Sequence, residues 1–294
     1  MKKNNFIKRY LSVCLFLTCF LFIFTGCAEN INQVSGINTS VNTENNYSKV
    51  IYIDSGNSDS ILIENNSEFA LIDGGDLDDD ELMLRKLAEN NVKKIKYLFV
   101  SHAHADHLGG LDSVVKNYDI ENIYFGNGEA TTRAYKDLLK EINNKGYEIK
   151  RAKENEELKL GNGTFKLLNT NWNKDNNLNN HSLIIKYLNG NDTFLFTGDA
   201  EKEVSENVKG KLGQIDVVKA SHHGSHNGIT SSEDILKEIN PKDIIITAGK
   251  GNRYGHPHKE TLNKLSGKNI YRNDINGEIT VTSNGNGYEI KTEK

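Results

Sequence analysis

The sequence predicts an α/β domain over residues 49–294, arranged as a four-layer αββα sandwich. Short runs rich in β-branched residues, separated by Gly, Asn and Asp, alternate with segments whose apolar residues follow a helical spacing. Several runs are almost continuously apolar, which is typical of strands buried on both faces. The alternation occurs in two successive halves, so we expect two sheets with helices outside them. No Pro- or Gly-rich linker divides the segment, which favours a single domain.

The first half is predicted to contain four strands and two helices. Leu82, Leu84 and Leu87 give the first helix its apolar positions. The near-continuous apolar run at residues 95–100 has the composition of a fully buried strand. The strands are predicted at residues 50–53, 60–63, 69–72 and 95–100, and the helices at 80–90 and 130–144.

The second half is predicted to add further strands, one helix and a closing hairpin. Residues 217–220 and 244–247 again have the composition of buried strands, and residues 232–239 between them have helical spacing. The remaining strands are predicted at residues 165–168, 182–188 and 193–197, and the closing hairpin at 279–282 and 288–290.

Residues 1–27 are predicted to be a lipoprotein signal peptide. Four basic residues precede an apolar stretch at residues 10–24, which is short for a membrane-spanning helix. The stretch ends in Phe-Thr-Gly before Cys27, which resembles a bacterial lipobox whose cysteine is lipidated. We therefore expect a lipid-anchored protein on the extracellular face of the cell membrane, or a secreted one if the lipobox is not used. An uncleaved anchor helix and a plain secretory signal are the alternatives.

The composition limits what the mature chain can be. Residues 28–48 are rich in Asn, Ser, Thr and Gly, which predicts a flexible tether. Removal of the signal leaves 32 basic and 40 acidic residues, a net charge of −8. The three cysteines all lie at or before Cys27, so the folded part has neither a disulfide framework nor a thiolate metal site.

The strongest chemical signal is Ser-His-Ala-His-Ala-Asp-His-Leu-Gly-Gly at residues 101–110. His102 and His104 are two residues apart, so in extended backbone both side chains point to one side and can bind one ion. Asp106 and His107 follow a turn and can face a second ion. Imidazole and carboxylate ligands without thiolate suit Zn, Fe or Mn. The alternative is a solvated polar loop.

Two later strand ends carry the same residue types. The strand at residues 193–197 is followed by Gly and Asp199, which could supply a carboxylate shared between two ions, although a lone Gly-Asp is usually only a turn. The strand at residues 217–220 is followed by Ser, His222, His223 and Gly. The sequence does not decide which histidine of the pair faces a metal.

Together these motifs resemble the metallo-β-lactamase fold superfamily, and in particular the hydrolase domain of the ComEC competence proteins and its free-standing relatives. Residues 54–60 are similar to that family's Asp-Val-Gly-Gln-Gly-Asp-Ala turn, and residues 71–75 to its next strand end. Ser-His-His-Gly-Ser at 221–225 and Tyr-Gly-His-Pro-His at 254–258 are similar to its two late motifs, which are more specific to this branch. The resemblance covers nearly all of residues 49–294 and implies the metallo-β-lactamase type of sandwich.

The resemblance implies roles for individual residues. Asp199 would bridge two divalent ions. The first ion would be held by His102 and His104, and the second by Asp106, His107 and His223. Asp73 would brace the metal loop by orienting a ligand. Catalytic contacts would come from Asp106, His222, His256 and His258, the last two being candidate proton donors or phosphate contacts.

His181 is the residue whose role stays open. Many members of the superfamily have a metal-binding histidine before the strand that leads to the bridging aspartate, whereas ComEC-like sequences have Asn and Ser there. Here the stretch reads Asn-Asn-His181-Ser. His181 is a metal ligand, a substrate contact or a residue with no part in the site.

A two-ion site with a bridging carboxylate lowers the pKa of a bound water and supports hydrolysis. We expect a phosphodiesterase or nuclease acting on DNA or a cell-wall polymer, because ComEC-like domains are linked to DNA degradation during uptake and related choline-phosphate esterases cut teichoic acid. The alternatives are an ester, lactone or β-lactam hydrolase, and a non-catalytic metal-binding surface protein. The net charge argues mildly against tight non-specific DNA binding. It does not exclude a local basic groove, which Lys219, Lys250, Arg253 and Lys259 could line because they are close in sequence to the late motifs.

Overall fold

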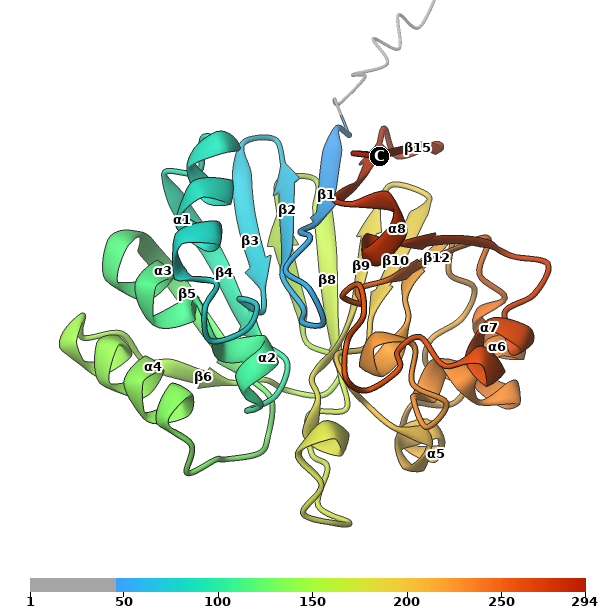
Figure 1. The fold of residues 1–294 in the computed structure, drawn as a ribbon. Coiled ribbons are helices and arrows are strands. Elements are labelled where there is room, and N and C mark those ends of the chain that lie inside the picture. The colour runs from blue at the N-terminus through green and yellow to red at the C-terminus, as the bar shows by residue number, and fades with distance from the viewer. Residues whose placement is uncertain (1–45) are drawn as a thin grey trace, which may run out of the picture. The chain divides into compact units, whose positions relative to one another are not determined.

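Two mixed β-sheets face each other in the computed structural model, which describes residues 46–294 (Figure 1). The described residues all belong to one compact unit. The predicted signal peptide with Cys27, and all but the end of the predicted tether, lie outside the described residues. No helix of the described part is long and apolar enough to span a bilayer.

The first sheet begins as an antiparallel meander and continues as parallel strands. Its order is β15-β14-β1-β2-β3-β4-β5-β6, with β3 to β6 parallel. The C-terminal hairpin joins this sheet, because β14 pairs with β1 in the register Val50↔Val281. The strands are β1 (Ser48–Tyr52), β2 (Ile61–Asn65), β3 (Glu68–Ile72), β4 (Lys94–Val100), β5 (Asp119–Phe125), β6 (Ile149–Arg151), β14 (Ile279–Ser283) and β15 (Tyr288–Thr292).

The second sheet has the same mixture in the opposite order along the chain. Its order is β13-β12-β11-β10-β9-β8-β7, with β10 to β13 parallel and the other pairs antiparallel. The strands are β7 (Glu157–Leu160), β8 (Gly163–Leu168), β9 (Ile184–Asn189), β10 (Asp192–Phe196), β11 (Val217–Lys219), β12 (Asp243–Ile246) and β13 (Asn269–Arg272).

The helices cover the outer face of each sheet, as Figure 1 shows. Apolar residues of the two inner faces form one core cluster, in which the rings of Phe99 and Phe165 meet edge to face with centroids 5.2 Å apart. A second cluster lies between the first sheet and its helices, and a third lies between the second sheet and its helices. These helices are α1 (Asp80–Glu89), α2 (Ala105–Leu108), α3 (Leu111–Asn117) and α4 (Arg133–Asn144) on the first sheet, and α5 (Ser205–Val208), α6 (Glu233–Ile239) and α7 (Lys259–Lys264) on the second; α8 (Asn273–Asn276) follows β13.

The predicted αββα sandwich is therefore confirmed. Every predicted strand and helix has a counterpart, with ends displaced by a few residues; the helix predicted at residues 130–144, for example, begins at Arg133. The prediction did not place β5, β6, β7, β13 or the helices α2, α3, α5, α7 and α8. Two of these strands are poorly buried: β6 is exposed throughout, and β7 has one buried position of four.

Candidate metal centre

The predicted ligands lie at the carboxyl ends of strands from both sheets. His102 follows β4, Asp199 follows β10, and His223 follows β11. Because the two sheets pack face to face, these ends meet at one edge of the sandwich. The loops that follow these strands line a cleft of about 380 Å³. Its lining comprises Asn57, His104, Ala105, Asp106, Thr132, Asn179, Asp199, His222, His223, Tyr254 and His256.

Four of the predicted metal residues converge in this cleft. Asp106, His107, Asp199 and His223 each offer one ligand atom, and these atoms all lie within 4.8 Å of one another. His107 Nε2 lies 3.3 Å from Asp199 Oδ1, and His223 Nε2 lies 3.4 Å from Asp106 Oδ2 and 3.6 Å from Asp199 Oδ2. All but Asp106 are fully buried.

The buried atoms of this cluster lack hydrogen-bond partners. His107 Nε2, His223 Nε2 and Asp199 Oδ1 are shielded from solvent, and none has a partner with hydrogen-bond geometry. A buried polar atom without a partner costs about 1–3 kcal/mol. Three such atoms directed at one point therefore fit a bound cation, which would satisfy all of them at once.

The other nitrogens of the two imidazoles are held from behind. His107 Nδ1 lies 2.8 Å from Asp73 Oδ2, and the other Asp73 oxygen accepts a 2.7 Å hydrogen bond from the backbone N–H of Ser101. His223 Nδ1 donates to the carbonyl oxygen of Thr247 at 2.7 Å. These bonds direct both Nε2 atoms at the cleft, as expected for metal-binding histidines. Asp73 thus lies where the sequence placed it.

His102 and His104 lie beside this cluster and point at each other. His102 Nε2 is 3.0 Å from His104 Nδ1, while His102 Nδ1 contacts the Ser101 hydroxyl at 3.0 Å. Burial lowers the pKa of both rings against the opposing charge of Asp199, so both are neutral and able to bind a metal at neutral pH. Within residues 46–294 neither belongs to a cluster of three or more ligand atoms.

The charged groups of the cluster shift one another's pKa. Burial by itself lowers the pKa of His107, but Asp199 and Asp73 outweigh it and hold that pKa well above its ordinary value. Burial by itself raises the pKa of Asp199, but His223 and His107 outweigh it and hold that pKa well below its ordinary value. A proton on His107 therefore occupies the position that a cation would take.

His222 and His223 diverge because the backbone is left-handed at both. Their φ values are 50° and 52°, and Gly224 follows at 81°. A non-glycine residue in this conformation costs about 1–2 kcal/mol. His223 enters the ligand cluster, whereas His222 stays partly exposed in the cleft, with Nδ1 3.5 Å from Glu201 and Nε2 3.7 Å from Asp199.

The two histidines that flank Pro257 are in different positions. His256 lines the cleft, with its ring centroid 5.3 Å from that of His222. Burial, with the neighbouring charges of His223, His222 and His258, lowers the pKa of His256 to about 4. His258 lies behind it, and its Nδ1 accepts a 3.0 Å hydrogen bond from the backbone of His226.

His181 is turned toward a backbone carbonyl. Its Nε2 lies 3.1 Å from the carbonyl oxygen of Asp175, and its backbone accepts from Asn127. In the described part of the chain it belongs to no cluster of potential ligand atoms, and it does not line the cleft.

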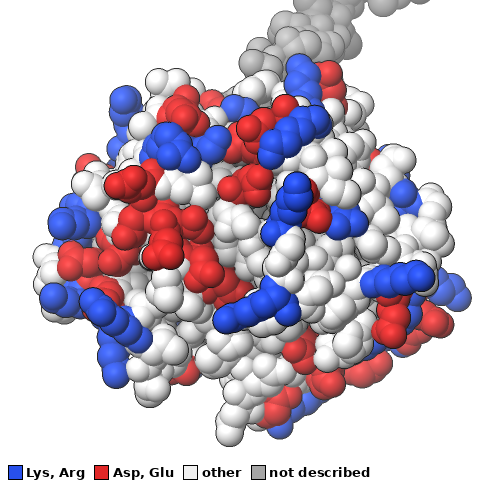
Figure 2. Space-filling model, viewed as in Figure 1, with Lys and Arg blue, Asp and Glu red and all other residues white. Residues whose placement is uncertain are grey.

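The predicted basic groove is wrong for one of its four members. Lys219 is fully buried and paired with Asp59 beneath the cluster, so it cannot line a groove. Lys250, Arg253 and Lys259 are exposed. On the face shown in Figure 2, acidic side chains gather over α1 and the segment before it, where Asp76, Asp78, Asp79 and Asp80 are close in sequence.

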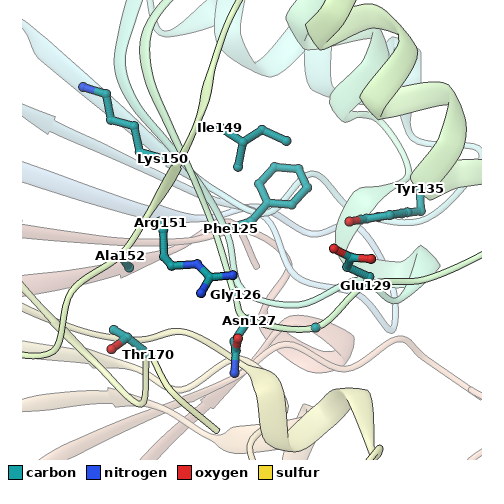
Figure 3. A pocket seen from close by; sticks show the side chains of 11 residues that line it. Phe125, Gly126, Asn127, Glu129, Tyr135, Ile149, Lys150, Arg151, Ala152 and Thr170 are labelled. Carbon is teal, nitrogen blue, oxygen red and sulfur yellow. The ribbon is translucent and has the colours of Figure 1, made fainter. Parts of the chain in front are cut away.

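A second cavity, of about 240 Å³, lies where β5 and β6 end. Figure 3 shows the guanidinium of Arg151 beside Gly126, with Lys150 pointing away and Phe125 and Ile149 forming an apolar side. None of the predicted site residues lines it. The metal-type chemistry is therefore concentrated in the first cleft.

A two-sheet αββα sandwich with a His/Asp cluster at its strand ends defines a class of metal-binding protein. The profile of the Metallo-beta-lactamase superfamily matches residues 53–248, and the chain belongs to this superfamily. The His/Asp cluster is consistent with the metal binding typical of the fold and suggests a metal-dependent hydrolase.

The similar proteins include a competence protein. The chain is 29% identical to ComE operon protein 3 of Bacillus subtilis over 68% of its own length, and 26% identical to Competence protein ComA of Neisseria gonorrhoeae over 80%. It spans 26% and 32% of these relatives. This confirms the ComEC-like resemblance.

Solved structures support the fold. The metallo-beta-lactamase fold protein YhfI from Bacillus subtilis matches with a TM-score of 0.52 and 14% identity, covering 77% of this chain and 95% of its own. CmlA, a diiron beta-hydroxylase from Streptomyces venezuelae, matches with a TM-score of 0.51 and 12% identity, covering 81% of this chain and 54% of its own.

Proposed function

We propose that this protein is a phosphodiesterase that uses two divalent ions, Zn in the first place or Mn or Fe, bound in the cleft between the sheets. The observation that carries the proposal is the convergence of the buried, unpartnered atoms of His107, His223 and Asp199 on one point of an open cleft. Asp106 would complete that site, and His102 and His104 would hold the other ion beside Asp199.

The ions would supply a water of lowered pKa and neutralise charge on the scissile group. The chain's own residues fit an anionic substrate. Burial by itself lowers the pKa of His222, but Asp199 and Glu201 outweigh it and raise that pKa above its ordinary value. His222 would therefore offer a charged N–H to a phosphodiester oxygen.

His256 and His258 would act around the leaving group. With a pKa of about 4, His256 is neutral at neutral pH, which suits a hydrogen bond to the substrate better than delivery of a proton from an imidazolium. His258 accepts from the His226 backbone through Nδ1, which leaves its Nε2 to carry the hydrogen.

Features of the rim favour a phosphodiester polymer. Tyr254 lines the cleft with 51% of its surface exposed, and the guanidinium of Arg253 lies over its ring at 4.9 Å. An exposed aromatic ring beside a cation can contact both a base and a phosphate of single-stranded DNA. One similar protein is named a competence protein, and the ComEC-like branch that the chain resembles is linked to DNA degradation during uptake, which favours DNA over a cell-wall polymer.

The proposal is tested by screening the purified protein from residue 28 onward, with Zn and with Mn. The substrates are single-stranded DNA, bis-p-nitrophenyl phosphate, p-nitrophenylphosphorylcholine and nitrocefin. We expect metal-dependent turnover of a phosphodiester, lost in Asp106→Asn and retained in Asp119→Asn, an exposed aspartate outside the cleft lining. Turnover of nitrocefin alone would favour the ester, lactone or β-lactam alternative, and metal binding without turnover would favour a non-catalytic surface protein.

We also propose that Cys27 is lipidated and holds the domain at the extracellular face of the cell membrane. The support is the basic, apolar and Phe-Thr-Gly-Cys27 pattern of residues 1–27. Two or more acyl chains are enough for stable anchoring. Cys27→Ser should release soluble protein or leave an unprocessed precursor, and unchanged membrane fractionation with normal processing would rule lipidation out.

A further inference from the structure

A buried lysine lies directly beneath the metal cluster. Lys219 is the last residue of β11 and, of all Lys and Arg in residues 46–294, the only one in the buried class. Its Nζ forms an ion pair with Asp59 Oδ2. It also donates a 3.1 Å hydrogen bond to the carbonyl oxygen of Gly198 and lies 3.7 Å from Asp199 Oδ1. Lys219 therefore contacts the backbone and faces the carboxylate of the central ligand.

Its partner Asp59 lies beside the other two buried ligands, His107 and His223. Asp59 Oδ1 accepts a 2.5 Å hydrogen bond from the Thr247 hydroxyl and lies 3.5 Å from His223 Nδ1. Asp59 Oδ2 lies 3.8 Å from His107 Nδ1. The backbone N–H of Asp59 donates to the carbonyl oxygen of Asp106 at 3.1 Å. Asp59 thus touches the metal loop and both ligand histidines from behind.

The charge of Lys219 also shows why a second group of ligand-type atoms behind the cluster needs no metal ion. Asp59, Asp73 and His107 form a second set of ligand-type atoms within 4.8 Å of one another, and all three residues are buried. That set already has its cation, because the ammonium of Lys219 lies against Asp59. The lysine therefore replaces an ion behind the cluster and leaves metal binding to the cleft.

We propose that Lys219 and Asp59 are positioning residues of the metal centre. Lys219 fixes the positions of Gly198 and the Asp199 carboxylate. Asp59, paired with Lys219, fixes the positions of His107 and His223 in turn. This inference rests on the proposed metal centre, though not on phosphodiester hydrolysis.

Stability alone does not explain the pair. Burying two charges is costly, and replacing a buried ion pair by neutral residues of similar size is often neutral or stabilising. A pair kept only for folding could therefore lie anywhere in the core. Here the two charged groups contact Asp199, the residue before it, both ligand histidines, and Thr247, whose carbonyl oxygen accepts from His223.

The test is a double-mutant cycle of Lys219→Met and Asp59→Asn, with the double variant. Zn affinity is measured by chelator competition, and stability by denaturant unfolding of the metal-free protein. We expect all three variants to bind Zn 10–100-fold more weakly, the usual size for loss of a ligand-orienting partner. The double variant should nevertheless unfold close to the wild-type midpoint. The exposed pair Lys209–Asp234, removed as Lys209→Met with Asp234→Asn, is the matched control and should leave Zn affinity unchanged.

Two results would overturn the proposal. One is Zn affinity within twofold of wild type in the double variant. That result would mean that Lys219 and Asp59 only neutralise each other's charge. The other is wild-type affinity in a folded Lys219→Met protein. If the single variants do not fold, the double variant decides. Metal binding is read without substrate, so a protein that binds Zn normally but cleaves no phosphodiester would contradict the proposed activity and not this inference.

Discussion

Asp199→Asn tests the metal centre most directly. The Asp199 carboxylate lies 3.3 Å from His107, 3.6 Å from His223 and 3.7 Å from Lys219, and it is buried. The substitution keeps the size of the side chain but removes the negative charge that would lie between two cations. We expect the variant to fold and to lose the second ion and most of the turnover.

The expected change in stability of the metal-free Asp199→Asn protein follows from the charges around Asp199. At an effective dielectric constant of about 20, attraction to Lys219 at 3.7 Å is about 4 kcal/mol. Repulsion from Asp106, whose ligand atom lies within 4.8 Å, is of similar size, at about 3.5 kcal/mol or more. The two nearly cancel, and His107 can release its proton once the carboxylate is gone. The metal-free variant should therefore unfold within a few degrees of wild type.

The expected difference in Tm between the variant and the wild type is larger when Zn is bound. An ion present at a hundredfold its Kd stabilises the fold by about 2.7 kcal/mol. In a domain of this size, 1 kcal/mol corresponds to about 2–4 °C in Tm, so each ion should raise the wild-type Tm by roughly 5–10 °C. Differential scanning fluorimetry with and without Zn, beside metal analysis of the same samples, measures both quantities. A wild-type Tm rise with two ions per chain in Asp199→Asn would refute the assignment.

Three further predictions concern individual histidines. Metal binding should release about one proton from His107, whose pKa is raised, so affinity should weaken as pH falls; calorimetry that shows no dependence on buffer ionisation enthalpy would contradict this. Because the pKa of His256 is lowered, the unfolded state binds more protons than the folded state between about pH 6.5 and pH 4. The contribution of His256 to stability is therefore complete above that window and is lost as pH falls through it. In urea titrations, the metal-free His256→Gln protein should lose less stability over this pH range than the wild type. His181→Asn should keep full metal content and phosphodiester turnover, and loss of one ion would make His181 a ligand.

The parts of the fold that the sequence predicted are those with strong hydrophobic patterns. The runs that became β4, β11 and β12 are buried at nearly every position, so composition alone identified them. The three residues of β6 are all exposed, and pairing with β5 rather than side-chain burial defines that strand. The C-terminal hairpin was predicted as an element, but its place beside β1 depends on pairing across more than two hundred residues.

The site divides in the same way. Histidines and aspartates in a rare cluster were visible in the sequence, and four of them converge. Lys219 was misplaced because a lysine is normally a surface residue, and only the fold shows that its strand position faces Asp59 inside the protein. Asp59 was noticed only as part of a turn, since no local pattern reveals which distant side chains a buried carboxylate will meet.

The His222–His223 pair shows what backbone geometry adds to residue type. In an extended chain, neighbouring side chains point to opposite faces, so either histidine could have faced the metal depending on the register of one residue. The left-handed backbone at both positions decides this, because it turns His223 toward Asp106 and Asp199 while His222 remains in the cleft between Glu201 and His256. Two such residues together cost about 2–4 kcal/mol. Strain of this size persists only where surrounding contacts enforce it, and here those contacts are the Thr247 carbonyl on one side and the ligand cluster on the other. Glycine at position 222 would adopt this backbone without strain but would lose the contacts of His222 with Glu201 and Asp199, so the two effects oppose each other. The metal-free His222→Gly protein should therefore unfold close to the wild-type midpoint and keep its metal content, while lacking the charged contact proposed for the substrate.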